Sequence, residues 1–103
     1  MNRASCHSLI LDRSQPSRFP LGQIVITRHA LDTLPPEAVR QALARHAQSD
    51  SGELDDEDRR ANEWALQEGY RVESVYRAGD GTKFWIITEA DRSVTTILLP
   101  ADY

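Results

Sequence analysis

Apolar positions follow a helix-like period in the first half of the chain and a strand-like period in the second half. The β-branched run at residues 23–27 predicts a strand. Within residues 36–48, side chains recur at the spacing of one helix face, namely Val39, Ala42, Leu43, His46 and Ala47. We expect a turn at residues 31–36, because Pro35 and Pro36 fit only the first turn of a helix.

A second helix is predicted between Asp55 and Gly69. Asp55 suits the N-cap, and Asp58 lies three residues later among carboxylates that the positive end of the helix dipole favours. Gly69 stands where a left-handed glycine commonly ends a helix. Because Trp64 shares a helix face with Ala65, we expect Trp64 in the core.

After the second helix the period changes to two. This period predicts three strands, at residues 70–77, 83–88 and 93–99. The connections between them are so short that they allow only antiparallel pairing. Pro100 then ends the last strand. The order β-α-α-β-β-β predicts an α+β domain, with two helices packed on one face of a four-stranded, mainly antiparallel sheet and a C-terminal three-strand meander.

The composition is that of a small globular protein. With 103 residues, 40% apolar and 27% charged, the chain predicts a single domain at residues 21–103 and a mobile N-terminal arm at residues 1–20. No apolar run reaches the roughly 20 residues of a membrane span. The apolar stretch at residues 9–11 is too short for a secretion signal, and the single cysteine, Cys6, cannot form an internal disulfide. We therefore expect a cytoplasmic protein without membrane contact.

Charge disfavours nucleic acid as the partner. The chain has a net charge of −4, and residues 21–103 carry nine basic and fifteen acidic side chains, a net charge of −6. A domain that tracks a phosphate backbone needs a basic stripe. The acidic run at residues 53–58 lacks the calcium-loop pattern and is explained by helix capping, while Cys6 and His7 have no paired ligands at metal spacing. We expect neither a metal nor a cofactor.

Three segments resemble a known family. They are similar to small proteins borne on bacterial plasmids, integrative elements and prophages, which are often labelled "type I restriction endonuclease subunit M". The three segments are LGQIVITRHAL (residues 21–31), residues 44–66 and above all FWIITEADRSVTTILLPADY (residues 84–103). That label does not fit, because a modification subunit needs a methyl-donor domain with a glycine-rich turn. The resemblance implies a mobile-element setting in the bacterial cytoplasm and carries no activity with it.

Members of this family have a His-x-x-Gly-Asp-Trp-Gly loop between the two helices. In this chain the loop keeps His46, Asp50 and Gly52, whereas Ser49 and Ser51 replace the first glycine and the tryptophan. If the loop has a shared function, the resemblance implies that this chain has weakened or redirected it.

One alternative function is a metal-independent ribonuclease or toxin, because barnase-like and RelE-like enzymes also place helices before an antiparallel meander. Such an enzyme needs a base, an acid and a cation at the reacting phosphate. His46, Glu89 and Arg92 are the candidates, with Asp50 able to orient the histidine. The competing interpretation is a buried structural histidine and a solvated turn with a local ion pair.

The leading hypothesis is a non-enzymatic accessory protein of a mobile element that binds another protein, with modulation of host defence as one version. Alternation in the strand at residues 83–88 puts Trp85 and Ile87 on one sheet face and Phe84 and Ile86 on the other. Because the helices cover only one face, we expect one of these apolar sets to lie partly exposed, and we favour the Trp85 set, with Val75, Ile97 and Leu99 as expected neighbours. An exposed apolar patch there would mark a partner or homodimer surface. We predict Trp85, Ile87, Asp91 and Arg92 as the partner-binding residues.

Overall fold

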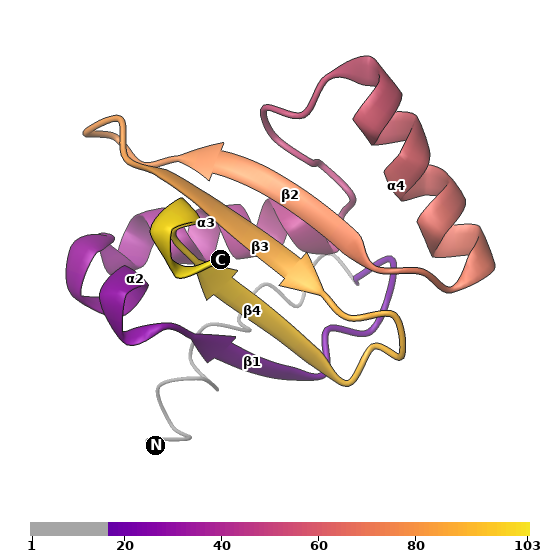
Figure 1. Ribbon diagram of the computed structural model, residues 1–103, viewed down its shortest axis with the longest axis horizontal. Helices are drawn as coiled ribbons and strands as arrows, with labels where there is room; N and C mark the ends of the chain where they lie inside the picture. Colours follow the sequence, from indigo (N-terminus) through magenta and orange to yellow (C-terminus); the bar gives the residue numbers. More distant parts are fainter. Residues whose placement is uncertain (1–16) are drawn as a thin grey trace.

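The computed structural model describes residues 17–103, and the four strands form one mixed sheet (Figure 1). The strands lie in the order β1-β4-β3-β2. Strands β2, β3 and β4 form an antiparallel meander, and β1 pairs in parallel with β4. Their bounds are β1 Gln23–Ile26, β2 Val72–Arg77, β3 Lys83–Thr88 and β4 Val94–Leu98. The predicted α+β fold is confirmed.

Most of the predicted arm, together with Cys6 and His7, lies outside the described residues. The last residues of the arm belong to the packed structure. Phe19 is 6% exposed and packs with Ala65 and Val72 in a small core cluster. Arg18 donates its backbone N–H to the carbonyl of Ala47 at 2.8 Å.

The helices are α2 (Arg28–Thr33), α3 (Pro36–Ala47) and α4 (Asp56–Glu68), and a 3₁₀ turn, η1 (Pro100–Asp102), ends the chain. The start and end of α4 follow the sequence signals, because Asp55 Oδ1 accepts from the N–H of Asp58 at 2.9 Å and Gly69 has a φ of +81°. The prediction of a turn at residues 31–36 is wrong for residues 31–33, which belong to α2. Thr27 Oγ1 accepts from the N–H of Ala30 at 3.1 Å and so caps the short helix α2.

The helices take different positions on the sheet. Helix α3 covers one face, α4 lies along the outer edge of β2, and η1 lies on the face opposite α3 (Figure 1). The main core forms between α3 and the sheet, and its innermost members are Phe84, Ile86 and Ile97. Two helices therefore flank the sheet, but only α3 is layered over its face.

The outer edge of β2 is closed by two neighbouring segments. Asn62 of α4 donates its Nδ2 to the carbonyl of Glu73 at 2.5 Å and accepts the Glu73 N–H at 3.2 Å. Val75 donates to the carbonyl of Ser51 at 3.1 Å, and its own carbonyl accepts from the N–H of Glu53 at 2.8 Å. A Cβ on residue 52 would lie 2.0 Å from the Val75 carbonyl oxygen, so this closure requires Gly52.

Candidate functional site

His46 lies in a buried hydrogen-bond network. Its imidazole is 0% exposed, with Nδ1 2.6 Å from Ser74 Oγ and Nε2 2.8 Å from Thr88 Oγ1. Thr88 Oγ1 lies 2.7 Å from Thr95 Oγ1, and the Thr95 hydroxyl donates to the carbonyl of Leu21 at 2.7 Å. These five groups, which we call the His46 network, run from β2 across β3 and β4 to the segment that precedes β1.

The last acceptor fixes the direction of the bonds from Leu21 back to His46 Nε2, and the neutral state of the imidazole fixes the bond at Nδ1. Because the Leu21 carbonyl can only accept, the Thr95 hydroxyl donates to it and accepts from Thr88. Thr88 then accepts the Nε2–H of His46, and Nδ1 accepts from Ser74. A neutral imidazole satisfies this pattern, and burial lowers the pKa of His46 to about 4. Both ring nitrogens are engaged and shielded from solvent.

Arg92 is tied to the protein backbone. Its guanidinium donates to three carbonyls, those of Tyr70 at 2.7 Å, Glu89 at 3.2 Å and Ala65 at 3.3 Å. Its Cζ also lies 5.6 Å from the centre of the Phe19 ring. These contacts join the β3–β4 turn to the C-terminal end of α4. The structure therefore does not assemble His46, the half-buried Glu89 and Arg92 into an open site.

The loop that follows His46 is held by Asp50. Arg45 donates to both carboxylate oxygens of Asp50, at 2.8 and 3.2 Å, and this pair holds the pKa of Asp50 below its usual range. Asp50 Oδ1 also accepts the N–H of Gly52 at 3.2 Å, and the Tyr76 hydroxyl donates to the Asp50 carbonyl. Ser49 adopts a φ of +64°, a conformation that favours glycine, and its hydroxyl is buried without a partner among the described residues.

The four residues predicted to bind a partner do not share one surface. Trp85 and Ile87 alternate along β3 with Phe84 and Ile86, which pack in the core against α3, and they therefore lie on the opposite sheet face. Asp91 is exposed in the β3–β4 turn, where Oδ1 accepts from the N–H of Ser93 at 3.0 Å and from its hydroxyl at 2.6 Å. Arg92 points to α4, as described above.

The chain's own C-terminus covers part of the face that carries Trp85. The Tyr103 ring lies 5.0 Å from the Trp85 ring, and Arg71 donates to the Tyr103 hydroxyl at 2.9 Å. Asp102 anchors this tail through contacts with Thr27 Oγ1 at 2.7 Å, the Leu99 N–H at 3.0 Å and His29 Nδ1 at 3.1 Å. These contacts hold the pKa of Asp102 below its usual range.

The apolar patch expected around Trp85 is smaller than the sequence suggested. Ile87 is 3% exposed, and Trp85 is half-buried. Ile97 and Leu99, expected beside them, instead belong to the core on the α3 side. The expectation failed for these two because the register pairs Ile97 with Ile86, whose side chain faces α3.

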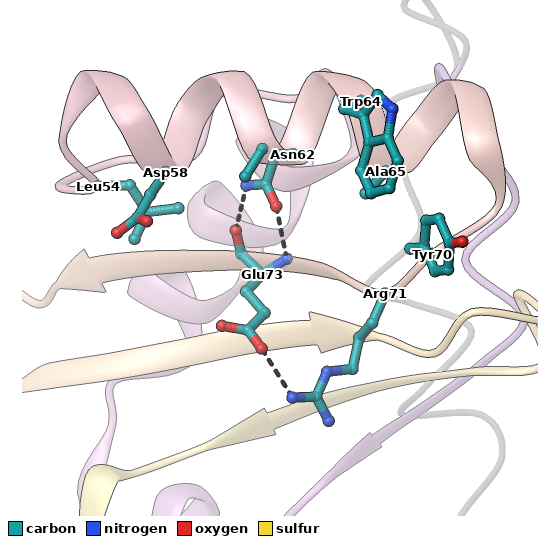
Figure 2. Close-up of a pocket in the computed structure, with 9 residues that line it drawn as sticks. Leu54, Asp58, Asn62, Trp64, Ala65, Tyr70, Arg71 and Glu73 are labelled. Carbon is teal, nitrogen blue, oxygen red and sulfur yellow. Dashed lines mark hydrogen bonds and ion pairs between the residues drawn. The ribbon is translucent and has the colours of Figure 1, made fainter.

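A groove of about 290 Å³ lies between α4 and the start of β2 (Figure 2). We call it the α4–β2 groove, and its lining residues are Leu54, Asp58, Ala61, Asn62, Trp64, Ala65, Tyr70, Arg71 and Glu73. Trp64 is 56% exposed and Tyr70 is 52% exposed, and their rings stack at 4.8 Å with an interplanar angle of 18°. The expectation of Trp64 in the core is therefore wrong.

The two ends of the α4–β2 groove differ in chemistry. Asp58 and Leu54 lie at one end, and the stacked rings of Trp64 and Tyr70 lie at the other (Figure 2). Within residues 17–103 the Asp58 carboxylate has no hydrogen-bond or ion-pair partner. On the β2 side, Arg71 donates to Glu73 Oε2 at 2.9 Å and also reaches Tyr103. Arg71 therefore links the lining of the groove to Tyr103, whose ring contacts Trp85.

We expected Trp64 in the core because it shares a helix face with Ala65. Asp58 was assigned only to the start of the helix and Tyr70 only to a strand, so neither was considered as part of a binding surface. The buried residues of α4 are Asn62 and Ala65. A helix along a sheet edge buries only a narrow stripe, so Trp64, which lies between these two residues in the sequence, points outward and is 56% exposed. The charged residues Arg60 and Glu68, one helical turn on either side of Trp64, were the available signal.

Other classes of site find no support within the described part of the chain. Among residues 17–103 there is no group of three or more His, Cys, Asp or Glu residues placed to hold a metal ion. No described helix is both long and apolar enough to span a bilayer. Comparison of the chain with protein-family models, with curated proteins and with solved structures gave no match.

Proposed function

We propose that the chain is a non-enzymatic accessory protein that acts by binding another protein, and that the α4–β2 groove is the binding surface. The observation that carries the proposal is the exposed Trp64 ring, stacked on Tyr70 beside a groove. Folding gains little from a tryptophan that is 56% exposed. Removal of such a ring from water by a partner is a large source of binding free energy.

The composition of the groove supports this proposal. Trp, Tyr and Arg are the residues most often found at energetic hot spots of interfaces, and Trp64, Tyr70 and Arg71 lie together here. The aromatic pair is held in place by its own stacking, so a partner meets a preorganised surface. Arg71 extends the same surface to Tyr103, which is 64% exposed.

The setting of the proposal comes from the resemblance of residues 84–103 to proteins of bacterial mobile elements. A partner in the cytoplasm of the bacterial host follows from that setting, and a host defence protein such as a restriction enzyme is the version it suggests. A second copy of this chain is the other partner considered, and size-exclusion chromatography of the purified protein separates the two.

The test is affinity capture from the bacterial host with the tagged full chain and two single variants. Trp64→Ser removes the exposed ring from the groove. Leu31→Ser is the matched control, because Leu31 is 58% exposed on α2 and does not line the groove. We expect one protein that is enriched with the wild type and with Leu31→Ser and is lost with Trp64→Ser. Equal capture by all three, or equal loss in both variants, contradicts the proposal.

A further inference from the structure

We propose that the α4–β2 groove binds a basic peptide segment in the polyproline II conformation, with an Arg or Lys three residues from a proline. This inference rests on the proposed function and names the partner's binding element. Three features of the groove lead to it: the Asp58 carboxylate, which has no partner within residues 17–103, the closed edge of β2, and the distance between the two ends of the groove.

The charge of the groove selects a cationic ligand. Asp58 and Glu73 are the carboxylates of the described lining, and Asp58 has no partner among the described residues. Among the residues that the structure describes, Arg71 is the one cation of the lining, and it is shared between Glu73 and Tyr103. A guanidinium or ammonium group beside Asp58 gains a charge-assisted hydrogen bond, whereas a polyanion is repelled.

The closed edge of β2 excludes recognition by strand addition. A peptide that extends a sheet needs free N–H and C=O groups on the edge strand. At Glu73 these groups bind the Asn62 side chain, and at Val75 they bind the backbone of residues 51 and 53. A polyproline II segment needs no backbone ladder, and it docks through its side chains in aromatic grooves.

The spacing along α4 matches this conformation. Asp58 and Trp64 are six residues apart, which is about 9 Å along a helix axis. In a polyproline II segment, positions i and i+3 share a face and are also about 9 Å apart. In a strand, positions on one face are about 7 Å or about 13 Å apart. The cation therefore reaches Asp58 while the proline packs on the Trp64–Tyr70 rings.

The test is selection from a phage-displayed library of random twelve-residue peptides on the immobilised full chain. Peptides retained by Trp64→Ser are subtracted, and the dissociation constant of the most enriched peptide is then measured by fluorescence anisotropy. Asp58→Asn keeps the size of the side chain but removes its charge, and Asp56→Asn is the matched control on the same turn outside the groove lining.

We expect enriched peptides with Arg or Lys three residues from a proline. Asp58→Asn raises the dissociation constant of the chosen peptide about tenfold, as the loss of one charge-assisted hydrogen bond predicts. Asp56→Asn leaves this dissociation constant unchanged. The inference is overturned if the enriched peptides lack a basic residue, if the basic residue lies two residues from the proline, or if no peptide is enriched over Trp64→Ser. It is also overturned if Asp58→Asn leaves the dissociation constant of the peptide unchanged. Host capture that depends on Trp64 would still support the proposed function in those cases, so the two failures are distinguishable.

Discussion

The His46 network and the α4–β2 groove place polar and aromatic side chains in opposite environments. In the network, His46, Ser74, Thr88 and Thr95 are all buried and hydrogen-bonded. In the groove, Trp64 and Tyr70 are more than half exposed, and Asp58 has no partner among the described residues. The histidine and hydroxyl side chains of the network, which are residue types that commonly perform catalysis, stabilise the fold here. The side chains that remain accessible to a ligand are those of Trp64, Tyr70 and Asp58 in the groove, which contribute little to the stability of the fold.

The network explains why a histidine is placed inside a small protein. Its hydrogen bonds form a continuous chain across β2, β3 and β4, in which each side chain is hydrogen-bonded to the next. A buried polar group without a partner is costly, so the network depends on all of its members at once. The aromatic pair of the groove has no such dependence, because Trp64 and Tyr70 are more than half exposed to solvent.

The largest expected effect is on stability, from His46→Ala. The substitution leaves a cavity, removes the acceptor of the Ser74 hydroxyl and removes the hydrogen bond that Thr88 accepts, so we expect the free energy of unfolding to fall by about 3–5 kcal/mol. Urea unfolding followed by circular dichroism measures this change. A loss below about 1 kcal/mol would show that the network contributes little to stability, and the contrast with the groove would disappear.

Acidification acts on the same network. The folded-state pKa of His46, about 4, lies below its unfolded value of 6.5. The unfolded chain therefore binds a proton that the folded chain rejects, and stability is complete above pH 6.5 and falls as the pH drops toward 4. We expect this residue to account for a loss of about 3 kcal/mol across that window.

Urea unfolding at several pH values measures this pH dependence, and His46→Gln is the control. Glutamine does not titrate and offers both a donor and an acceptor. The variant should therefore show a flatter dependence between pH 6.5 and pH 4 than the wild type. Parallel curves for the two proteins would contradict the assignment of the pH dependence to His46.

Arg92→Ala distinguishes a structural arginine from a catalytic one. The loss of three hydrogen bonds to carbonyls should lower the free energy of unfolding by about 2–3 kcal/mol. Arg60→Ala, which removes an exposed arginine of α4, should change it by less than about 0.5 kcal/mol. The ribonuclease alternative instead predicts that expression of the wild type arrests growth and that Arg92→Ala relieves the arrest, and we expect no arrest.

The smallest predicted change is a gain of stability in the loop that follows the network. Ser49→Gly relieves a left-handed backbone and removes a buried hydroxyl that has no partner among residues 17–103. We expect the free energy of unfolding to rise by about 1 kcal/mol. Thermal unfolding of Ser49→Gly beside Ser49→Ala, which removes the hydroxyl and keeps the strain, separates the two contributions. Equal melting temperatures for both variants would show that the backbone is not strained.

The sequence predicted most of the fold because its strongest signals are local. Asp55 and Gly69 delimit α4 through capping, and the two-residue period after Gly69 defines the meander. Helix α2 was missed because it is six residues long and its cap, Thr27, stands at the end of a predicted strand. The position of α4 at the edge of β2 depends on Asn62, whose bonds to the Glu73 backbone no periodicity reveals.

The candidate site was harder to predict than the fold. The sequence raised a buried structural histidine as one interpretation of His46, but its partners Ser74 and Thr88 are 28 and 42 residues away in the sequence. The sheet face of Trp85 followed from alternation, whereas its cover, Tyr103, depends on the return of the chain at η1. Exposure of Trp64 is a consequence of tertiary packing and was predicted incorrectly.

The most direct test combines two readouts on one variant, Trp64→Ser. Partner capture and urea unfolding are measured side by side with the wild type. We expect that capture is lost while the free energy of unfolding changes by no more than about 1 kcal/mol, the value of one aromatic stacking contact. Unchanged capture, or a loss of stability of several kcal/mol, would contradict the claim that this groove is a binding surface separate from the stabilising core.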